Sequence, residues 1–284
     1  MTSSPSLFVF GVGFTALALA RLLQAEGGWR IAGTRRPPVG EAPGIPLHPF
    51  DGEAPLDPAL FHGVTHVLAS IPPGPDGDPA LRIHGAHLAA LPRLRWVGYL
   101  STTGVYGDTA GAWVDEESPT APTQPRSARR VLAEAAWGDP ALGLPAHVFR
   151  LAGIYGPGRS PLDRARAGDA RRIDLPGHVS SRIHVDDAAR ALRASMDRPR
   201  PGAVYNVADD EPAPPEAVTA WACARLGLPI PPLVPLAEAG LSPMAASFYA
   251  DTRRVRNARI KDELGVTLAY PTYREGLEAL ARGA

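Results

Sequence analysis

The stretch SLFVFGVGFTALALARLLQAEG, residues 6–27, decides the fold. It opens with an apolar run typical of a buried strand and continues over 14–26 with a helical pattern. Gly11, Gly13 and Ala16 stand between the two as G-x-G-x-x-A. The first glycine allows a tight turn, the second lets the backbone approach a pyrophosphate, and the alanine allows close packing. Glycines also punctuate ordinary loops, but the strand-turn-helix context predicts a dinucleotide-binding loop.

Short apolar runs alternate with helical patterns through the first half of the chain, which predicts a parallel α/β sheet. The runs expected as strands are 6–12, 29–36, 45–51, 64–73, 95–102 and 146–156, and the expected helices include 80–91 and 126–137. We therefore expect a Rossmann-type doubly wound parallel sheet in residues 1–156. A smaller C-terminal substrate lobe takes most of 157–284, with 183–197 returning to pack on the first domain.

The second predicted strand ends in GTRR, residues 33–36, where an acidic residue would bond the free 2′-hydroxyl of NAD. Arg35 and Arg36 stand there instead, and arginine pairs well with a 2′-phosphate. Both arginines could also be solvated at a strand end. The pattern favours NADP as the cofactor over NAD.

Composition restricts the class of partner. The 284 residues carry 29 basic and 29 acidic side chains, and this zero net charge argues against nucleic acid or an anionic membrane as the partner. No apolar run is long enough to span a membrane, and no signal peptide is recognisable, so a cytoplasmic protein with a small-molecule partner is expected. Cys223 is the single cysteine. It excludes an intrachain disulfide and a cysteine metal cluster, and no metal site is predicted.

Four further landmarks follow one another along the chain: YLSTTGVYGD (99–108), FRLAGIYGPGR (149–159), RIHVDDAARAL (182–192) and VYNVADDEP (204–212). In this order they resemble the extended short-chain dehydrogenase/reductase superfamily, the NAD(P)-dependent epimerases and dehydratases of nucleotide sugars. The resemblance implies an active-site hydroxyl at Thr102 and a nucleotide-sugar-like substrate. It also suggests a homodimer.

The resemblance fails at the catalytic helix. The family carries Tyr-x-x-x-Lys there, and alignment on Glu134 puts Arg126 at the tyrosine position and Arg130 at the lysine position. Arginine stays protonated at any working pH, so Arg126 cannot act as the base. Arg130 keeps a cation for the nicotinamide ribose in a chain whose only lysine is Lys261. The pattern resembles an atypical branch that keeps the fold and cofactor loop but lacks the usual active-site residues.

Other side chains could still take part in chemistry. We expect Thr102 to bond the reacting oxygen, unless its hydroxyl only satisfies backbone, and we hypothesise that Tyr106 has taken over acid/base duty. Arg159 and Arg182 are the expected substrate-diphosphate ligands, although they could be ordinary surface arginines. The residues expected to contact the cofactor are Gly11, Gly13, Phe14, Thr15, Thr34, Arg35, Arg36, Ser70 and Arg130.

His184, Asp186 and Asp187 look like a metal or acid/base cluster at first sight. Their position before a helix instead predicts that one of the aspartates caps the helix while His184 packs beneath it.

Two functions of different class remain open. The first is an NADP-dependent oxidoreductase or epimerase acting on a nucleotide-sugar-like small substrate, with a hydrophobic carbonyl compound as another substrate class. The second is a non-catalytic NADP-binding sensor or scaffold. Substrate-dependent oxidation of bound NADPH separates the two.

Overall fold

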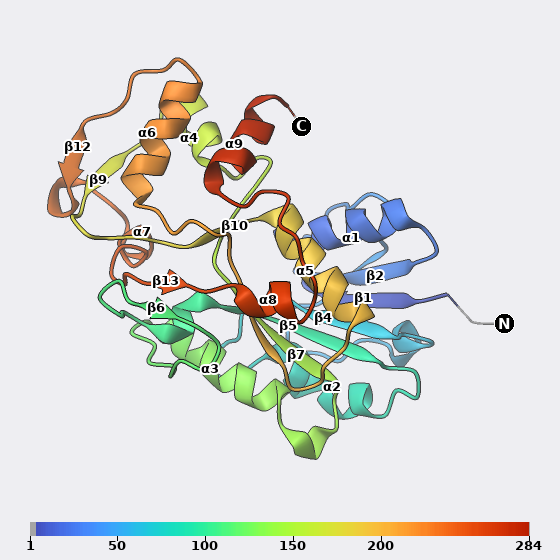
Figure 1. Cartoon of the computed structure of the whole chain (residues 1–284). Helices are drawn as coiled ribbons and strands as arrows, with labels where there is room; N and C mark the ends of the chain where they lie inside the picture. The colour runs from blue at the N-terminus through green and yellow to red at the C-terminus, as the bar shows by residue number, and fades with distance from the viewer. Residues whose placement is uncertain (1–3, 284) are drawn as a thin grey trace.

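The computed structural model describes residues 4–283 and is built around a seven-stranded sheet (Figure 1). The strands run in the order β11-β7-β5-β4-β1-β2-β3, and each neighbouring pair is parallel. The order reverses between β1 and β4, and open α/β sheets bind ligands outside the carboxyl ends of the strands at such a point. This confirms the predicted Rossmann-type fold. The bounds are β1 Ser6–Phe10, β2 Arg30–Arg35, β3 Leu47–Pro49, β4 His66–Ala69, β5 Trp96–Thr102, β7 Ala146–Leu151 and β11 Val204–Val207.

Helices cover both faces of the sheet because its strands carry apolar side chains on both. On β1, Leu7 and Val9 join the core under one helical layer, whereas Phe8 and Phe10 join the core under the other. The first layer contains α1 and α5, which pack against each other, and the second contains α2 and α3. The bounds are α1 Phe14–Glu26, α2 Pro79–Ala89, α3 Pro125–Trp137 and α5 Val185–Asp197.

The chain beyond residue 157 contributes to the sheet layers as well as to a second lobe. It supplies α5 to one face, β11 to the sheet edge beside β7, and α8 (Ala258–Asp262), which packs on β11. Lysine and arginine occupy the last turn of α8, because the negative end of the helix dipole favours positive charges there.

The lobe has a small core of its own at the top of Figure 1, formed by α4, α6 and α9. Both α4 and α9 begin with a capping box, Ser160 with Asp163 and Thr272 with Glu275, which satisfies the first free amides of each helix. The bounds are α4 Pro161–Arg166, α6 Pro215–Arg225, α7 Pro243–Ala246 and α9 Tyr273–Ala281. Short parallel pairs join β8 (Gly153–Tyr155) to β10 (Arg182–His184), β9 (Arg172–Asp174) to β12 (Leu233–Pro235), and β6 (Trp113–Val114) to β13 (Arg254–Val255).

Four 3₁₀ helices complete the secondary structure of the part described. They are η1 Pro58–Phe61, η2 Thr103–Tyr106, η3 Pro140–Leu142 and η4 Leu236–Glu238. Cys223 is buried within α6. No helix within residues 4–283 has the length and apolar character needed to cross a membrane.

Candidate functional site

The glycine loop leaves β1 in a conformation that requires glycine at its first position. Gly11 has φ +86°, and a Cβ there would lie 2.8 Å from Cγ1 of Ile71. Its N–H donates to Oγ1 of Thr34 at 3.0 Å. The turn is therefore held against β2 and the end of β4 at a point where a side chain would not fit.

Thr34 and its neighbour Gly33, both in β2, contact the glycine loop. Thr34 is completely buried, and its carbonyl accepts from the N–H of Val12 at 2.8 Å. A Cβ on Gly33 would lie 2.5 Å from Cγ2 of Val12 and 2.6 Å from the carbonyl oxygen of Val9. Gly33 was not anticipated from the sequence, although a glycine inside a strand is a known sign of close backbone approach. Thr34 thus positions the loop, and its predicted contact with the cofactor stays a prediction.

The start of α1 fits a phosphate group. Gly13 is the exposed N-cap residue, no side chain caps the helix, and the first turn holds no acidic residue. Apart from its two chain neighbours, only the Gly11 carbonyl, at 3.9 Å, lies within 4 Å of a Cβ placed on Gly13 in the part of the chain described, so the space beside Gly13 is open. Phe14 is half-buried and Thr15 is buried. Free amides at a helix N-terminus beside an open glycine suit the pyrophosphate of a dinucleotide.

Arg35 and Arg36 have different surroundings. The Arg35 side chain donates to the carbonyl of Val12 from Nε at 3.3 Å and from Nη2 at 3.1 Å. Its Nη1 donates to the carbonyls of Val39 and Glu41, both at 3.2 Å. Arg36 is exposed, and its side chain makes no hydrogen bond or ion pair with the residues that the structure describes. Arg35 therefore ties the loop after β2 to the glycine loop, while Arg36 has its donors free.

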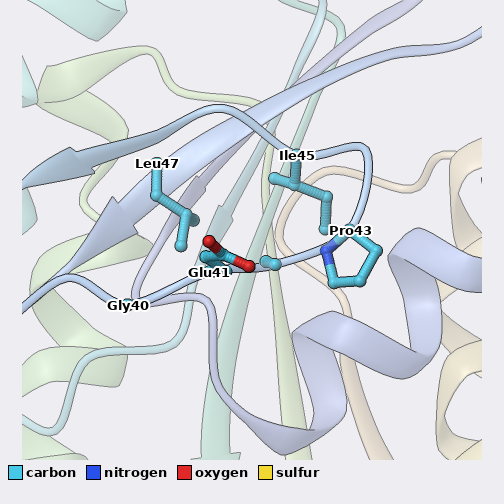
Figure 2. Close-up of a pocket in the computed structure, with 6 residues that line it drawn as sticks. Gly40, Glu41, Pro43, Ile45 and Leu47 are labelled. Carbon is cyan, nitrogen blue, oxygen red and sulfur yellow. The ribbon is translucent and has the colours of Figure 1, made fainter.

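The loop that Arg35 holds borders a cavity of about 440 Å³ (Figure 2). Residues of the β2–β3 connection and the start of β3 line it, namely Gly40, Glu41, Ala42, Pro43, Ile45 and Leu47. None of the residues predicted to contact cofactor or substrate lines this cavity.

The carboxyl ends of β1, β4 and β5 bring three predicted residues to one edge of the sheet, namely Gly11, Ser70 and Thr102. Ser70 is half-buried, and its N–H donates to the carbonyl of Phe10 at 2.9 Å. Thr102 is the N-cap of η2, where its Oγ1 accepts from the N–H of Gly104 at 3.1 Å. Its hydroxyl proton can still be donated, because that contact uses only a lone pair.

The two arginines of α3 point to different neighbours. Arg130 is half-buried, and its Nη1 donates to the carbonyl of Leu100 and to Oη of Tyr99. Arg126 is exposed, and its guanidinium carbon lies 4.4 Å from the ring centre of Phe248. Phe248 was not anticipated from the sequence, because the segment that carries it follows α3 by more than a hundred residues.

A buried polar network lies beneath this helix. Arg150 pairs with Glu134 at 2.8 Å and donates from Nη1 to Oη of Tyr106 at 2.9 Å. Tyr106 in turn donates to Oδ1 of Asn206 at 2.7 Å, and Ser101 donates to Glu134. Tyr106 is 1% exposed, and burial raises the pKa of its phenol. These surroundings favour a structural role for Tyr106, and the acid/base hypothesis stays untested.

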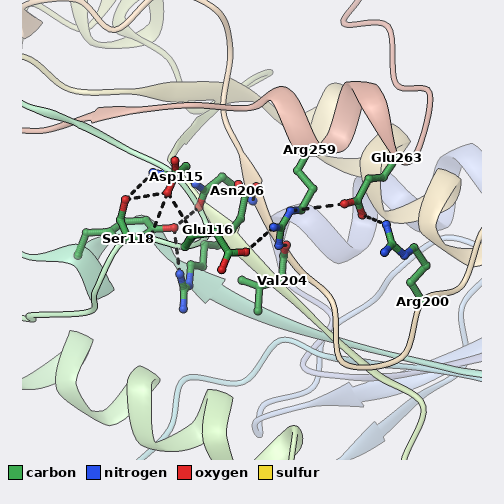
Figure 3. A network of polar contacts seen from close by, with 11 residues as sticks. Asp115, Glu116, Ser118, Arg200, Val204, Asn206, Arg259 and Glu263 are labelled. Atoms are coloured by element: carbon green, nitrogen blue, oxygen red, sulfur yellow. Dashed lines mark hydrogen bonds and ion pairs between the residues drawn. The ribbon is translucent and has the colours of Figure 1, made fainter.

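The network continues into the loop after β6 (Figure 3). Glu116 accepts from the N–H of Asn206 at 2.7 Å, and Arg259 of α8 pairs with Glu117 and Glu263. Burial raises the pKa of Glu116. This acidic loop, which lies between η2 and α3, thus contacts both β11 and α8.

The expected substrate arginines lie in different settings. Arg159 is exposed, with its guanidinium carbon 5.5 Å from the ring centre of Phe14, so it borders the start of α1. Arg182 belongs to β10 and donates from Nη2 to Oγ of Ser180 and to the carbonyl of Ala213, both at 3.1 Å. Its Nη1 is buried without a hydrogen-bond partner among the described residues. Arg159 is therefore accessible beside the glycine loop, whereas Arg182 is anchored within the lobe.

His184 corrects the expected cap of α5. His184 is itself the N-cap, and its Nδ1 accepts from the N–H of Asp186 at 3.2 Å. Asp187 instead accepts from the N–H groups of Ala269 and Tyr270, both at 2.9 Å, and tethers that segment to α5. An imidazole nitrogen can serve as the capping acceptor when it carries no proton. Within residues 4–283, no group of three His, Cys, Asp or Glu side chains is arranged to hold a metal ion.

Solved structures of other proteins have the same fold. A solved structure of a functionally unknown conserved protein from Silicibacter pomeroyi DSS is 52% identical, with a TM-score of 0.88 and 99% of each chain covered. A protein from Methylobacillus flagellatus assigned to the NAD-dependent epimerases/dehydratases is 25% identical, with a TM-score of 0.74 and 99% of each chain covered.

Among curated proteins, YeeZ of Escherichia coli K12 is 27% identical over 217 residues, which is 70% of this chain and 76% of YeeZ. No protein-family model matches the sequence. Three observations point to the same superfamily: the strand order, the glycine loop at the switch point and the full-length similarity to an epimerase/dehydratase. The chain belongs to the extended short-chain dehydrogenase/reductase superfamily of NAD-dependent epimerases and dehydratases.

Proposed function

We propose that the chain binds NADP at the carboxyl edge of its sheet and acts as an oxidoreductase or epimerase on a nucleotide-sugar-like small substrate. The observation that carries this proposal is the glycine loop, with Gly11 at φ +86° held by Thr34 and open amides at the start of α1. This loop ends a strand at the topological switch point, where dinucleotides bind in such sheets.

The preference for NADP rests on Arg36. Its side chain is exposed at the end of β2 and has no hydrogen-bonding partner in the described chain. The GTRR segment at this strand end contains no carboxylate that could bind the ribose 2′-hydroxyl of NAD. A free guanidinium pairs well with a 2′-phosphate. Arg35 has the different task of bracing the loop, because its donors already serve three carbonyls.

Bound NADP supplies the hydride chemistry, and the chain positions the reactants. Arg130 stands beside the end of β5 through its bond to the Leu100 carbonyl, so a cation remains near the expected nicotinamide ribose. Thr102 offers its hydroxyl to the reacting oxygen of the substrate. Since Arg126 cannot release a proton at working pH, proton transfer falls to water or to the substrate. This altered site supports the proposal that the chain belongs to an atypical branch of its superfamily.

Cofactor titration tests the proposal. We expect the cofactor-stripped protein to bind NADPH more tightly than NADH, followed by nicotinamide fluorescence. Arg36→Ala should weaken NADPH binding about tenfold or more and leave NADH binding unchanged, because it removes a charge-assisted contact. Arg35→Ala should weaken both nucleotides alike. If neither nucleotide binds at physiological concentration, the proposed function fails.

A non-catalytic NADP sensor is the second candidate. The observation in its favour concerns Tyr106, at the end of η2. Its phenol is buried and hydrogen-bonded to both Arg150 and Asn206, so it is not free to act on a substrate. A sensor would bind NADPH without oxidising it in the presence of nucleotide sugars or other carbonyl compounds. Turnover of bound NADPH with any of these compounds would decide for the enzyme.

A further inference from the structure

Arg126 is exposed at the start of α3 and has free hydrogen-bonding capacity. One face of its guanidinium packs on Phe248, 4.4 Å from the ring centre. Its side chain makes no hydrogen bond or ion pair with any residue from 4 to 283. An arginine that stacks on an aromatic ring keeps its in-plane N–H donors free for a carboxylate or phosphate.

The first turn of α3, which carries this arginine, lies beside the expected position of the substrate. The next residue, Ser127, is buried, and its Oγ lies 2.6 Å from the point where Gly104 would carry a Cβ. Oγ1 of Thr102 lies 3.4 Å from the same point and accepts from the N–H of Gly104. The start of α3 therefore packs directly on the turn that presents Thr102.

A second guanidinium, that of Arg253, lies within electrostatic range of the first. Arg253 donates from Nη1 to the carbonyl of Gly107 at 2.7 Å and pairs with Asp251 at 3.2 Å. Burial lowers the pKa of Arg253, and the positive charge of Arg126 lowers it further while Asp251 and Asp108 oppose the change. The two guanidinium groups therefore interact electrostatically, but Asp251 pairs with Arg253, whereas Arg126 has no counter-charge among the described residues.

The nearby carboxylates are already engaged. Asp251 accepts from Oγ1 of Thr123 at 2.7 Å as well as from Arg253. Asp108 accepts from the N–H of Thr252 at 2.9 Å and from the N–H of Ala110 at 3.2 Å. Neither carboxylate reaches Arg126, whose charge is left for a ligand.

We propose that Arg126 is a substrate-binding residue that holds an anionic group, a carboxylate or a phosphate, of the molecule that reacts above Thr102. Phe248 fixes the plane of the guanidinium. This inference rests on the proposed function, because it places the anion beside the bound nicotinamide. It makes the substrate a small carbonyl or alcohol compound with a negative charge, a class that includes sugar phosphates and sugar acids.

The test uses the full chain saturated with NADPH, so that the phosphate site of the glycine loop is filled. Inorganic pyrophosphate and malonate are titrated by calorimetry as the phosphate and carboxylate probes. We expect at least one to bind, and Arg126→Gln to weaken it about tenfold or more, since charge-assisted bonds to arginine are lost. Arg126→Lys should lose part of this affinity, because lysine cannot offer a planar pair of donors. The stronger probe tells a phosphate from a carboxylate.

Arg129→Gln is the matched control. Arg129 is exposed on the same helix and makes no side-chain hydrogen bond or ion pair in the described chain, so it changes the net charge equally. The proposal is overturned if wild-type protein binds neither probe at millimolar concentration, or if the Arg126 and Arg129 variants bind as wild type does. Equal thermal midpoints of the variants exclude a folding defect.

Failure of the proposed function gives a different result. If wild-type protein does not bind NADPH, the same titrations are made on the cofactor-free chain. A loss of anion binding specific to Arg126→Gln then supports the anion site without the cofactor, and equal binding by both variants overturns it. Phe248→Ala provides a further check. It removes the ring but no charge, so it should weaken binding of the probe less than Arg126→Gln does.

Discussion

Glu134 of α3 and Arg150 of β7 form a buried ion pair, with their side chains 9% and 8% exposed and 2.8 Å between Oε2 and Nη2. Arg150 also reaches Glu134 through Nε, at 3.2 Å to each carboxylate oxygen. The pair joins the helix that carries Arg126 to the centre of the sheet. It therefore fixes where the first turn of α3 stands relative to Thr102.

Glu134→Gln should lower the free energy of unfolding by about 3–5 kcal/mol, because it leaves the Arg150 guanidinium buried without a counter-charge. Chemical denaturation at neutral pH measures the loss. The double variant Glu134→Leu with Arg150→Met removes both charges and should lose less than the sum of the two single variants. Additive losses would show that the two side chains do not stabilise each other.

The two glycines of the cofactor loop should respond differently to alanine. Gly11→Ala should cost about 1–3 kcal/mol of unfolding free energy, because φ +86° disfavours a side chain and Ile71 blocks the methyl group. Gly13 has φ −103°, an extended conformation with open space around it. Gly13→Ala should therefore keep its stability but bind NADPH about tenfold more weakly, since the methyl group occupies the path of the pyrophosphate. Equal cofactor affinity in Gly13→Ala and wild type would contradict the assigned position of the cofactor.

Tyr106→Phe should leave NADPH-dependent turnover unchanged and cost about 1–2 kcal/mol of unfolding free energy. The cost arises because Arg150 and Asn206 each lose a buried hydrogen-bond partner. Tyr155→Phe is the control, because the Tyr155 Oη is buried without a hydrogen-bond partner in the described chain. It should cost less than Tyr106→Phe. A folded Tyr106→Phe protein that has lost turnover would instead establish Tyr106 as the acid/base.

Acid should destabilise the protein through His66. Burial, with smaller effects of Arg95 and Arg193 opposed by Asp197, lowers the pKa of His66 from 6.5 to about 4. The folded chain therefore keeps this ring neutral while the unfolded chain protonates it below pH 6.5. Its contribution is complete above pH 6.5 and is lost as the pH falls towards 4, by about 2 kcal/mol at pH 5.

His66→Phe tests this pH dependence. The phenyl ring can keep the packing on Trp29, whose ring centre lies 4.9 Å from that of His66. Denaturation at pH 7.5 and pH 5 should show a smaller difference for the variant than for wild type. Other buried histidines also have lowered pKa values, for example His147, so some acid sensitivity should remain. Identical pH dependence of both proteins would contradict the assignment to His66.

Local sequence was sufficient where the structure depends on neighbours along the chain. The loop from Gly11 to Ala16 follows from one strand, one turn and one helix. The structure shows at position 11 the positive φ that requires a glycine there. The resemblance to the superfamily likewise places Arg126 at the position of its tyrosine from the sequence alone. Contacts between distant segments were not visible. Phe248 stacks on Arg126 across 122 positions of the chain, and no local pattern predicts which ring arrives there.

The sequence by itself determined the fold class and predicted the cofactor loop, because apolar periodicity and glycine conformation are properties of short segments. Its resemblance to the superfamily also predicted that Arg126 takes the place of the usual acid/base tyrosine. The tertiary structure alone decided the roles of individual polar groups. It showed that Arg35 braces carbonyls while Arg36 is free, and that Tyr106 is locked into a buried network. The physical reason is that hydrogen bonding and burial depend on which distant groups meet, and only packing of the whole chain brings them together.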